Sequence, residues 1–75
     1  MIVVYGNRQC LTCNILRVAL MDSKLNYRFY YIGNGPNDDI TVEELEQLHP
    51  SLSTVPYILD DGKEISLVEL ERKIF

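Results

Sequence analysis

The order of strand-like and helix-like segments is the feature that most constrains the fold of this chain. Residues 2–5 form an apolar run that ends at a glycine and an asparagine, which predicts a short buried strand. Residues 10 to about 23 carry a helical repeat of apolar side chains. Residues 27–32 are rich in aromatic side chains and predict a second strand. The first half of the chain therefore predicts a strand, a helix and a strand.

The second half of the chain predicts two more helices around a hairpin. The elements are a helix over residues 41–49, a strand over residues 55–59, a short strand that ends at residue 65, and a last helix directly after it. Thr41 with Glu44, and Ser66 with Glu69, have the spacing of capping boxes, which mark the two helix starts. Asp61-Gly62 is a strong signal for a two-residue hairpin turn.

We expect one face of the first helix to cover the sheet. Its apolar side chains recur at the i, i+4, i+7 and i+8 positions of an amphipathic helix. They are Leu11, Ile15, Val18 and Ala19, and Leu16 and Leu20 widen the same face. The last helix is expected to bury Leu67, Leu70 and Ile74 in the same way.

The element order β-α-β-α-β-β-α predicts an α/β fold with a four-stranded mixed sheet flanked by three helices. The first β-α-β unit predicts two parallel strands, and the hairpin adds an antiparallel pair. A chain of 75 residues has room for one domain, residues 1–75.

Charge and hydropathy exclude several classes of protein. Seven Lys and Arg residues against eleven Asp and Glu residues give a formal net charge of −4, which argues against nucleic-acid binding. No apolar run approaches the ~20 residues that span a bilayer. The first residues lack the basic segment of a signal peptide. We therefore expect a soluble, cytoplasmic protein with no membrane partner.

Two cysteines, Cys10 and Cys13, stand at the predicted junction between the first strand and the first helix. The free amides and the positive dipole end of a helix N-terminus stabilise a thiolate there. The spacing also lets the second cysteine close a disulfide, so the pair predicts a thiol–disulfide switch. The alternatives are a structural disulfide, buried inert cysteines, or half of a zinc site. Structural zinc needs four ligands, and His49 is the only other cysteine or histidine.

The chain resembles a glutaredoxin over nearly its whole length. The resemblance rests on the first strand, the Cys10-Leu11-Thr12-Cys13 motif, the downstream Thr54-Val55-Pro56, the hairpin turn and the final helix. The small size is also similar to the glutaredoxin-like redoxins that serve ribonucleotide reductase, and to short phage glutaredoxins.

The resemblance implies a thioredoxin fold and a dithiol mechanism. Cys10 would attack a disulfide, and Cys13 would resolve the mixed disulfide that results. A cis peptide between Val55 and Pro56 would face the cysteines. The backbone of Val55 would then pair with an extended substrate or with glutathione, beside Thr54.

The chain departs from the glutaredoxin pattern at three places. Leu11-Thr12 replaces the usual Pro-Tyr between the cysteines. Ser66-Leu67 replaces a Gly-Gly that binds the γ-glutamyl end of glutathione, so Ser66 either donates to that carboxylate or simply caps the last helix. Arg8, one position after the usual lysine, either binds the glycyl carboxylate or is an exposed loop cation.

The resemblance also implies partners. We expect a monomer without metal or bound prosthetic group that reduces protein or glutathione mixed disulfides, with ribonucleotide reductase as the best single target. Glutathione is the expected reductant, and a thioredoxin-type reductase is the runner-up. The rival from another class is a non-enzymatic redox-sensing regulator with a thioredoxin fold.

Overall fold

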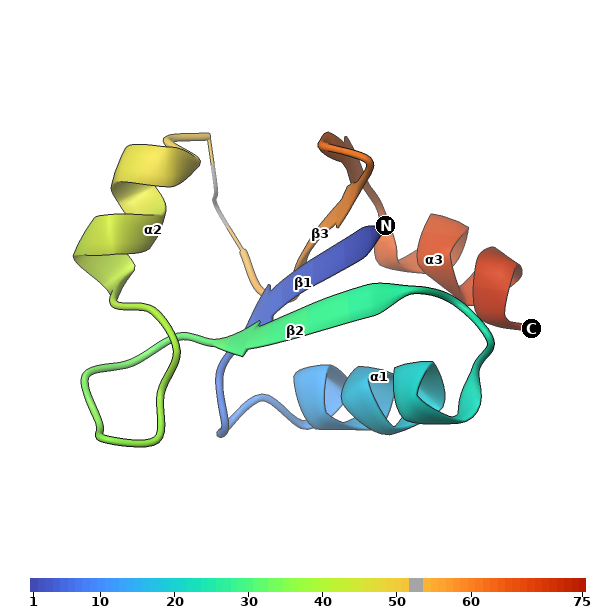
Figure 1. Cartoon of the computed structure of the whole chain (residues 1–75), viewed down its shortest axis with the longest axis horizontal. Coiled ribbons are helices and arrows are strands. Elements are labelled where there is room, and N and C mark those ends of the chain that lie inside the picture. Colours follow the sequence, from blue (N-terminus) through green and yellow to red (C-terminus); the bar gives the residue numbers. More distant parts are fainter. Residues whose placement is uncertain (52–53) are drawn as a thin grey trace.

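A four-stranded mixed sheet with three helices forms the α/β fold of the computed structural model, which describes residues 1–51 and 54–75 (Figure 1). The elements are β1 (Ile2–Gly6), α1 (Leu11–Asp22), β2 (Tyr27–Tyr31), α2 (Val42–Leu48), β3 (Tyr57–Asp60), β4 (Lys63–Ile65) and α3 (Leu67–Ile74). The expected element order and sheet composition are confirmed. In the described residues, no helix is long and apolar enough to cross a membrane.

The strands lie in the order β2-β1-β3-β4. β1 pairs with β2 in parallel, as predicted, and with β3 in antiparallel orientation, with Tyr5 opposite Tyr57. Asp61 and Gly62 link β3 to β4, and both take positive φ, 50° and 86°, as a tight hairpin turn requires. β1 and β3 therefore form the centre of the sheet.

The third strand begins two residues later than its predicted start. We expected a strand over residues 55–59, whereas β3 begins at Tyr57 and continues to Asp60. Pro56 has no N–H to donate to a strand ladder, which restricts proline to strand edges and starts. Residues 54–56 thus lie outside the sheet ladder, directly before its first paired residue.

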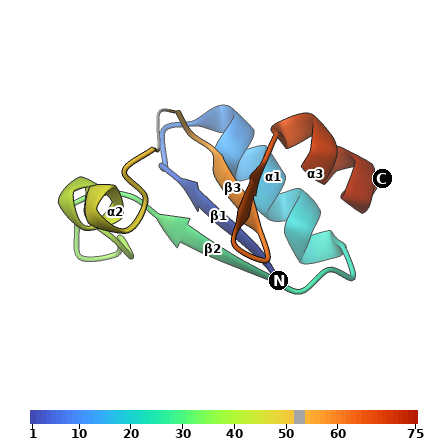
Figure 2. The ribbon, with the colours of Figure 1, turned by 90° about the horizontal axis from the view of Figure 1, so that it is seen from above.

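Each face of the sheet has its own apolar core, because successive side chains of a strand point to opposite faces. On one face, Ile2, Val4 and Ile58 pack with Leu16 and Leu20 of α1 and Leu70 of α3. On the other face, Tyr5, Tyr57 and Leu59 pack with Leu45 of α2. Figure 2 shows α1 and α3 side by side, with α2 at the far end of the sheet.

The prediction for the buried face of α1 is confirmed for Leu16 and Leu20 and wrong for Leu11, Ile15 and Val18. The side chains that face the sheet are Cys13, Leu16 and Leu20, whereas Leu11, Ile15 and Val18 are 72%, 60% and 55% exposed. Both sets recur at helical spacing, on opposite sides of the helix. Contacts with the sheet, and not the helical spacing, therefore decide which set turns inward.

Both predicted capping boxes are present. Thr41 caps α2 with Glu44, and Ser66 caps α3 with Glu69. The predicted face of α3 is also confirmed, since Leu70 is fully buried and both Leu67 and Ile74 pack against the core. The capping box of α3 fixes Ser66 directly after β4, at the edge of the candidate site.

Candidate active site

Cys10 is the N-cap residue of α1 and is partly exposed. Its backbone is extended, with φ −87° and ψ 109°, and its carbonyl accepts the first helical bond, from the Asn14 N–H. Its Sγ accepts a hydrogen bond from the Cys13 N–H, 3.2 Å away. A sulfur atom takes the place that an Asp or Ser oxygen usually occupies at a helix start. Positive potential at the helix end therefore acts directly on the Cys10 sulfur.

Cys13 lies behind Cys10 and is completely buried. Burial raises the pKa of the Cys13 thiol to about 12, and the hydrogen bond with Cys10 adds to this. Both cysteines are free thiols in this structure. The pair is therefore unequal: one sulfur is accessible at a helix N-terminus, and the other is held as a neutral thiol below it.

Gly6 makes room for Cys13. A methyl group on the Gly6 Cα would lie 2.8 Å from both Cβ and Sγ of Cys13, and 3.2 Å from Cζ of Phe29. The sequence by itself marks this glycine only as the end of the first strand. The sequence signal for its contact with Cys13 is a glycine four residues before the first cysteine. That spacing alone does not predict the contact, because the contact forms only when α1 packs against β1.

Arg8 is engaged by the loop that follows β2. Its Nε donates to Oδ1 of Asp38 at 3.0 Å, its Nη2 donates to the Asn37 carbonyl, and its guanidinium lies 4.1 Å from the ring centroid of Tyr31. Asn14 Nδ2 donates to the Arg8 carbonyl at 3.0 Å. These contacts tie the turn that precedes Cys10 to α1 and to the loop, and they give Arg8 an anionic partner within the chain.

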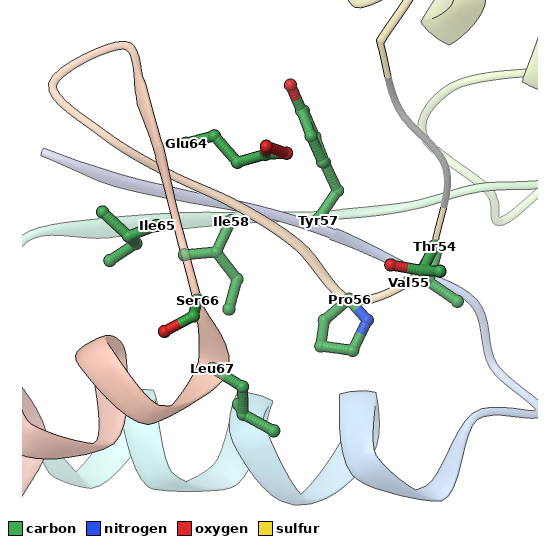
Figure 3. A pocket seen from close by; sticks show the side chains of 9 residues that line it. All are labelled: Thr54, Val55, Pro56, Tyr57, Ile58, Glu64, Ile65, Ser66 and Leu67. Atoms are coloured by element: carbon green, nitrogen blue, oxygen red, sulfur yellow. The ribbon is translucent and has the colours of Figure 1, made fainter.

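A cavity of about 500 Å³ lies between the start of β3 and the start of α3 (Figure 3). Five predicted site residues line it, namely Thr54, Val55, Pro56, Ser66 and Leu67. Tyr57, Ile58, Glu64 and Ile65 complete the lining. The Val55–Pro56 peptide is cis, as the resemblance implied. The structure thus brings together two segments of the predicted site that are ten residues apart in the chain.

The cavity and the cysteine pair meet at one end of the sheet. Tyr5 pairs with Tyr57 in an antiparallel ladder, so Gly6, which follows Tyr5, and Pro56, which precedes Tyr57, lie at the same end of the sheet. Gly6 in turn abuts Cys13. The carboxyl end of β1 therefore carries the cysteines, and the amino end of β3 carries the proline beside them.

Ser66 has the helix-capping role that was one of its two predicted alternatives. Its Oγ accepts from the Glu69 N–H at 3.1 Å, and its own N–H and Oγ lie 3.4 Å and 3.3 Å from Oε1 of Glu69. The Glu69 carboxylate therefore already occupies the N-terminus of α3. Sequence reasoning assigned this carboxylate to the capping box and did not connect it with the cavity.

Leu11 and Thr12 are exposed on α1 and do not line this cavity. Thr12 instead borders a second cavity, of about 340 Å³, between α1 and α3, which Ile15, Leu16 and Ile74 also line. These two predicted site residues therefore lie on α1 next to the cysteines and outside the cavity between β3 and α3. Within residues 1–51 and 54–75, no group of three or more His, Cys, Asp or Glu side chains is placed to hold a metal ion.

Comparison with known proteins identifies no relative: no family model, no curated protein and no solved structure matches the chain. The chemistry open to the chain therefore follows from its own side chains. A buried thiol below an accessible thiol at a helix N-terminus, beside an open cavity, is suited to exchange with disulfides.

Proposed function

We propose that this protein is a glutaredoxin-type thiol–disulfide oxidoreductase with a thioredoxin fold. The observation that carries the proposal is the unequal cysteine pair: Cys10 caps α1 with its sulfur, and Cys13 lies buried beneath it. The mixed sheet with three helices is compatible with that fold. A reducing compartment such as the cytoplasm keeps such a dithiol available for reaction.

The reaction runs in two exchanges. The Cys10 thiolate attacks one sulfur of the substrate disulfide, which forms a mixed disulfide and releases the other sulfur as a thiolate that takes up a proton. Cys13 then loses its proton and attacks Sγ of Cys10. This second exchange releases the remaining substrate thiol and leaves a Cys10–Cys13 disulfide. Two electrons pass from the protein to the substrate.

The roles of the two cysteines follow from their surroundings. The Cys13 amide, 3.2 Å from the Cys10 sulfur, stabilises negative charge on Cys10 before it attacks the substrate disulfide. Cys13 has a pKa raised to about 12 by burial, so it stays protonated until the mixed disulfide places an electrophilic sulfur beside it. Premature attack by Cys13 on outside disulfides is also blocked by its burial.

Two contacts favour a thioredoxin-type reductase over glutathione as the electron donor. Arg8, the expected partner of the glycyl carboxylate, is paired with Asp38. The N-terminus of α3, the expected place of the γ-glutamyl carboxylate, holds Glu69. Glutathione would have to displace or approach a carboxylate at both points. Protein disulfides, with ribonucleotide reductase as the first target to try, need neither contact.

The test is turnover with each donor. The oxidised protein is supplied with NADPH and either glutathione plus glutathione reductase or a thioredoxin reductase, and a small disulfide such as hydroxyethyl disulfide is the acceptor. Continuous NADPH consumption that depends on Cys10 supports the proposal, and faster turnover with thioredoxin reductase supports that donor. A protein that is oxidised once and does not cycle with either donor is instead a redox sensor.

A further inference from the structure

The cavity beside the cysteine pair is negatively charged. Among the described residues that line it, Glu64 is the only charged one. Glu64 forms no ion pair within residues 1–51 and 54–75. Its pairing with Leu59 puts it on the same face of the sheet as Tyr57, and Figure 3 shows both side chains on the same side of the hairpin. An unneutralised carboxylate therefore stands at the upper rim of the cavity.

A second carboxylate, that of Glu69, lies behind one of the lining residues. Glu69 reaches back to Ser66, which lines the cavity, and its Oε1 lies 3.3 Å from the Ser66 Oγ. Arg8 does not line the cavity and is paired with Asp38, 3.0 Å away. A ligand in the cavity thus meets the Glu64 carboxylate and no cation among the described lining residues, and the Glu69 carboxylate lies directly behind Ser66.

The cavity also has room for an extended chain. β4 pairs with β3 only from Ile58 to Asp60, and after Ile65 the chain turns away into α3. β4 therefore leaves the outer edge of Val55 to Tyr57 open to the cavity. An extended segment added at such an edge points alternate side chains to the two faces of the sheet. One of its side chains then points to the face that carries Glu64.

We propose that this cavity selects disulfide substrates in which a lysine or arginine flanks the reacting cysteine, and that the Glu64 carboxylate binds this positively charged side chain. The inference rests on the proposed function, because the substrate is placed by its reaction with Cys10. It names a substrate class, cationic protein or peptide disulfides, and it disfavours anionic ones, glutathione disulfide included. Glu64 acts in binding and not in the exchange of sulfur bonds.

The experiment measures single-turnover oxidation of the reduced protein by three peptide disulfides. Each peptide has one cysteine flanked on both sides by lysine, glutamine or glutamate, and each is a mixed disulfide with 2-mercaptoethanol. The rate constant for each peptide is divided by the rate constant with which dithiothreitol reduces the same peptide disulfide. This ratio corrects for the intrinsic reactivity of each disulfide. Glu64→Gln removes the charge, and Glu46→Gln on α2, away from the cavity, is the matched control.

We expect the wild-type protein to react with the lysine peptide about two- to fivefold faster than with the glutamine peptide, the range that one exposed ion pair supports, and slowest with the glutamate peptide. Glu64→Gln should remove this order, and Glu46→Gln should keep it. Equal rates for all three peptides, or an order unchanged by Glu64→Gln, would overturn the inference and leave the proposed function standing. If no peptide oxidises the protein, the proposed function fails, and the inference fails with it.

Discussion

Replacing Gly6 by alanine tests the contact on which the cysteine arrangement depends. The added methyl group would lie 2.8 Å from two atoms of Cys13, whereas carbon atoms in good contact are about 3.5–4.0 Å apart. Cys13 is fully buried and lies in the first turn of α1, so it has no free space to enter. The substitution therefore forces α1 and β1 apart by several tenths of an ångström or more.

The expected loss of stability follows from two opposing terms. Overpacking of a well-packed core costs about 1–3 kcal/mol. Replacing a glycine lowers the entropy of the unfolded chain and returns about 0.4–1 kcal/mol. We expect Gly6→Ala to lower the free energy of unfolding by about 1–2 kcal/mol, which lowers Tm by roughly 4–16 °C in a domain of this size.

The assay is urea unfolding of the reduced protein, followed by far-ultraviolet circular dichroism. Gly35→Ala is the matched control, because Gly35 is exposed and its added methyl group would meet only the Asp38 side chain, at 3.0 Å. The control should change stability by less than half as much. A Gly6→Ala protein that is as stable as the wild type, or more stable, would show that Cys13 is not packed against this glycine.

Three further outcomes are expected. Cys10→Ser should abolish disulfide reduction, while Cys13→Ser should accumulate a mixed disulfide on Cys10, which mass spectrometry detects; the reverse pattern would exchange the two roles. Because the pKa of Cys13 rises on folding from 9.0 to about 12, the unfolded state loses this proton first. The free energy of unfolding should then fall as pH rises from 9.0 towards about 12, more than in Cys13→Ala, and equal pH dependence in urea titrations would contradict this. Ser66→Ala and Thr41→Ala should each cost about 1 kcal/mol in the same titrations, because each removes a helix cap, and an unchanged midpoint would contradict the capping geometry.

The sequence predicted which residues belong to the candidate site better than it predicted what those residues contact. The spacing of Cys10 and Cys13 at a strand-to-helix junction predicts their pairing, and the resemblance to glutaredoxins predicts Thr54, Val55, Pro56 and Ser66 as site residues. What Arg8 would contact was not predictable, because Asp38 lies thirty residues away in a loop without a periodic pattern. The same holds for Glu64, which sequence reasoning left aside as part of a short strand.

The sequence by itself determined the local elements of this protein. Periodicity, two capping boxes and the Asp61-Gly62 turn act over a few residues, so each could be located before any tertiary contact was known. These signals specify the order of strands and helices, and through it the mixed sheet.

Only the tertiary structure decided which side of α1 is buried and what surrounds the cysteines. The helix has apolar residues on two opposite sides, and its local sequence does not say which side meets the sheet. The rotation of α1 is decided where the helix packs on β1: Cys13 lies against Gly6, and Leu16 and Leu20 enter the core with Ile2 and Val4. That same rotation leaves Leu11 and Ile15 in solvent and places the Cys10 sulfur at the helix start.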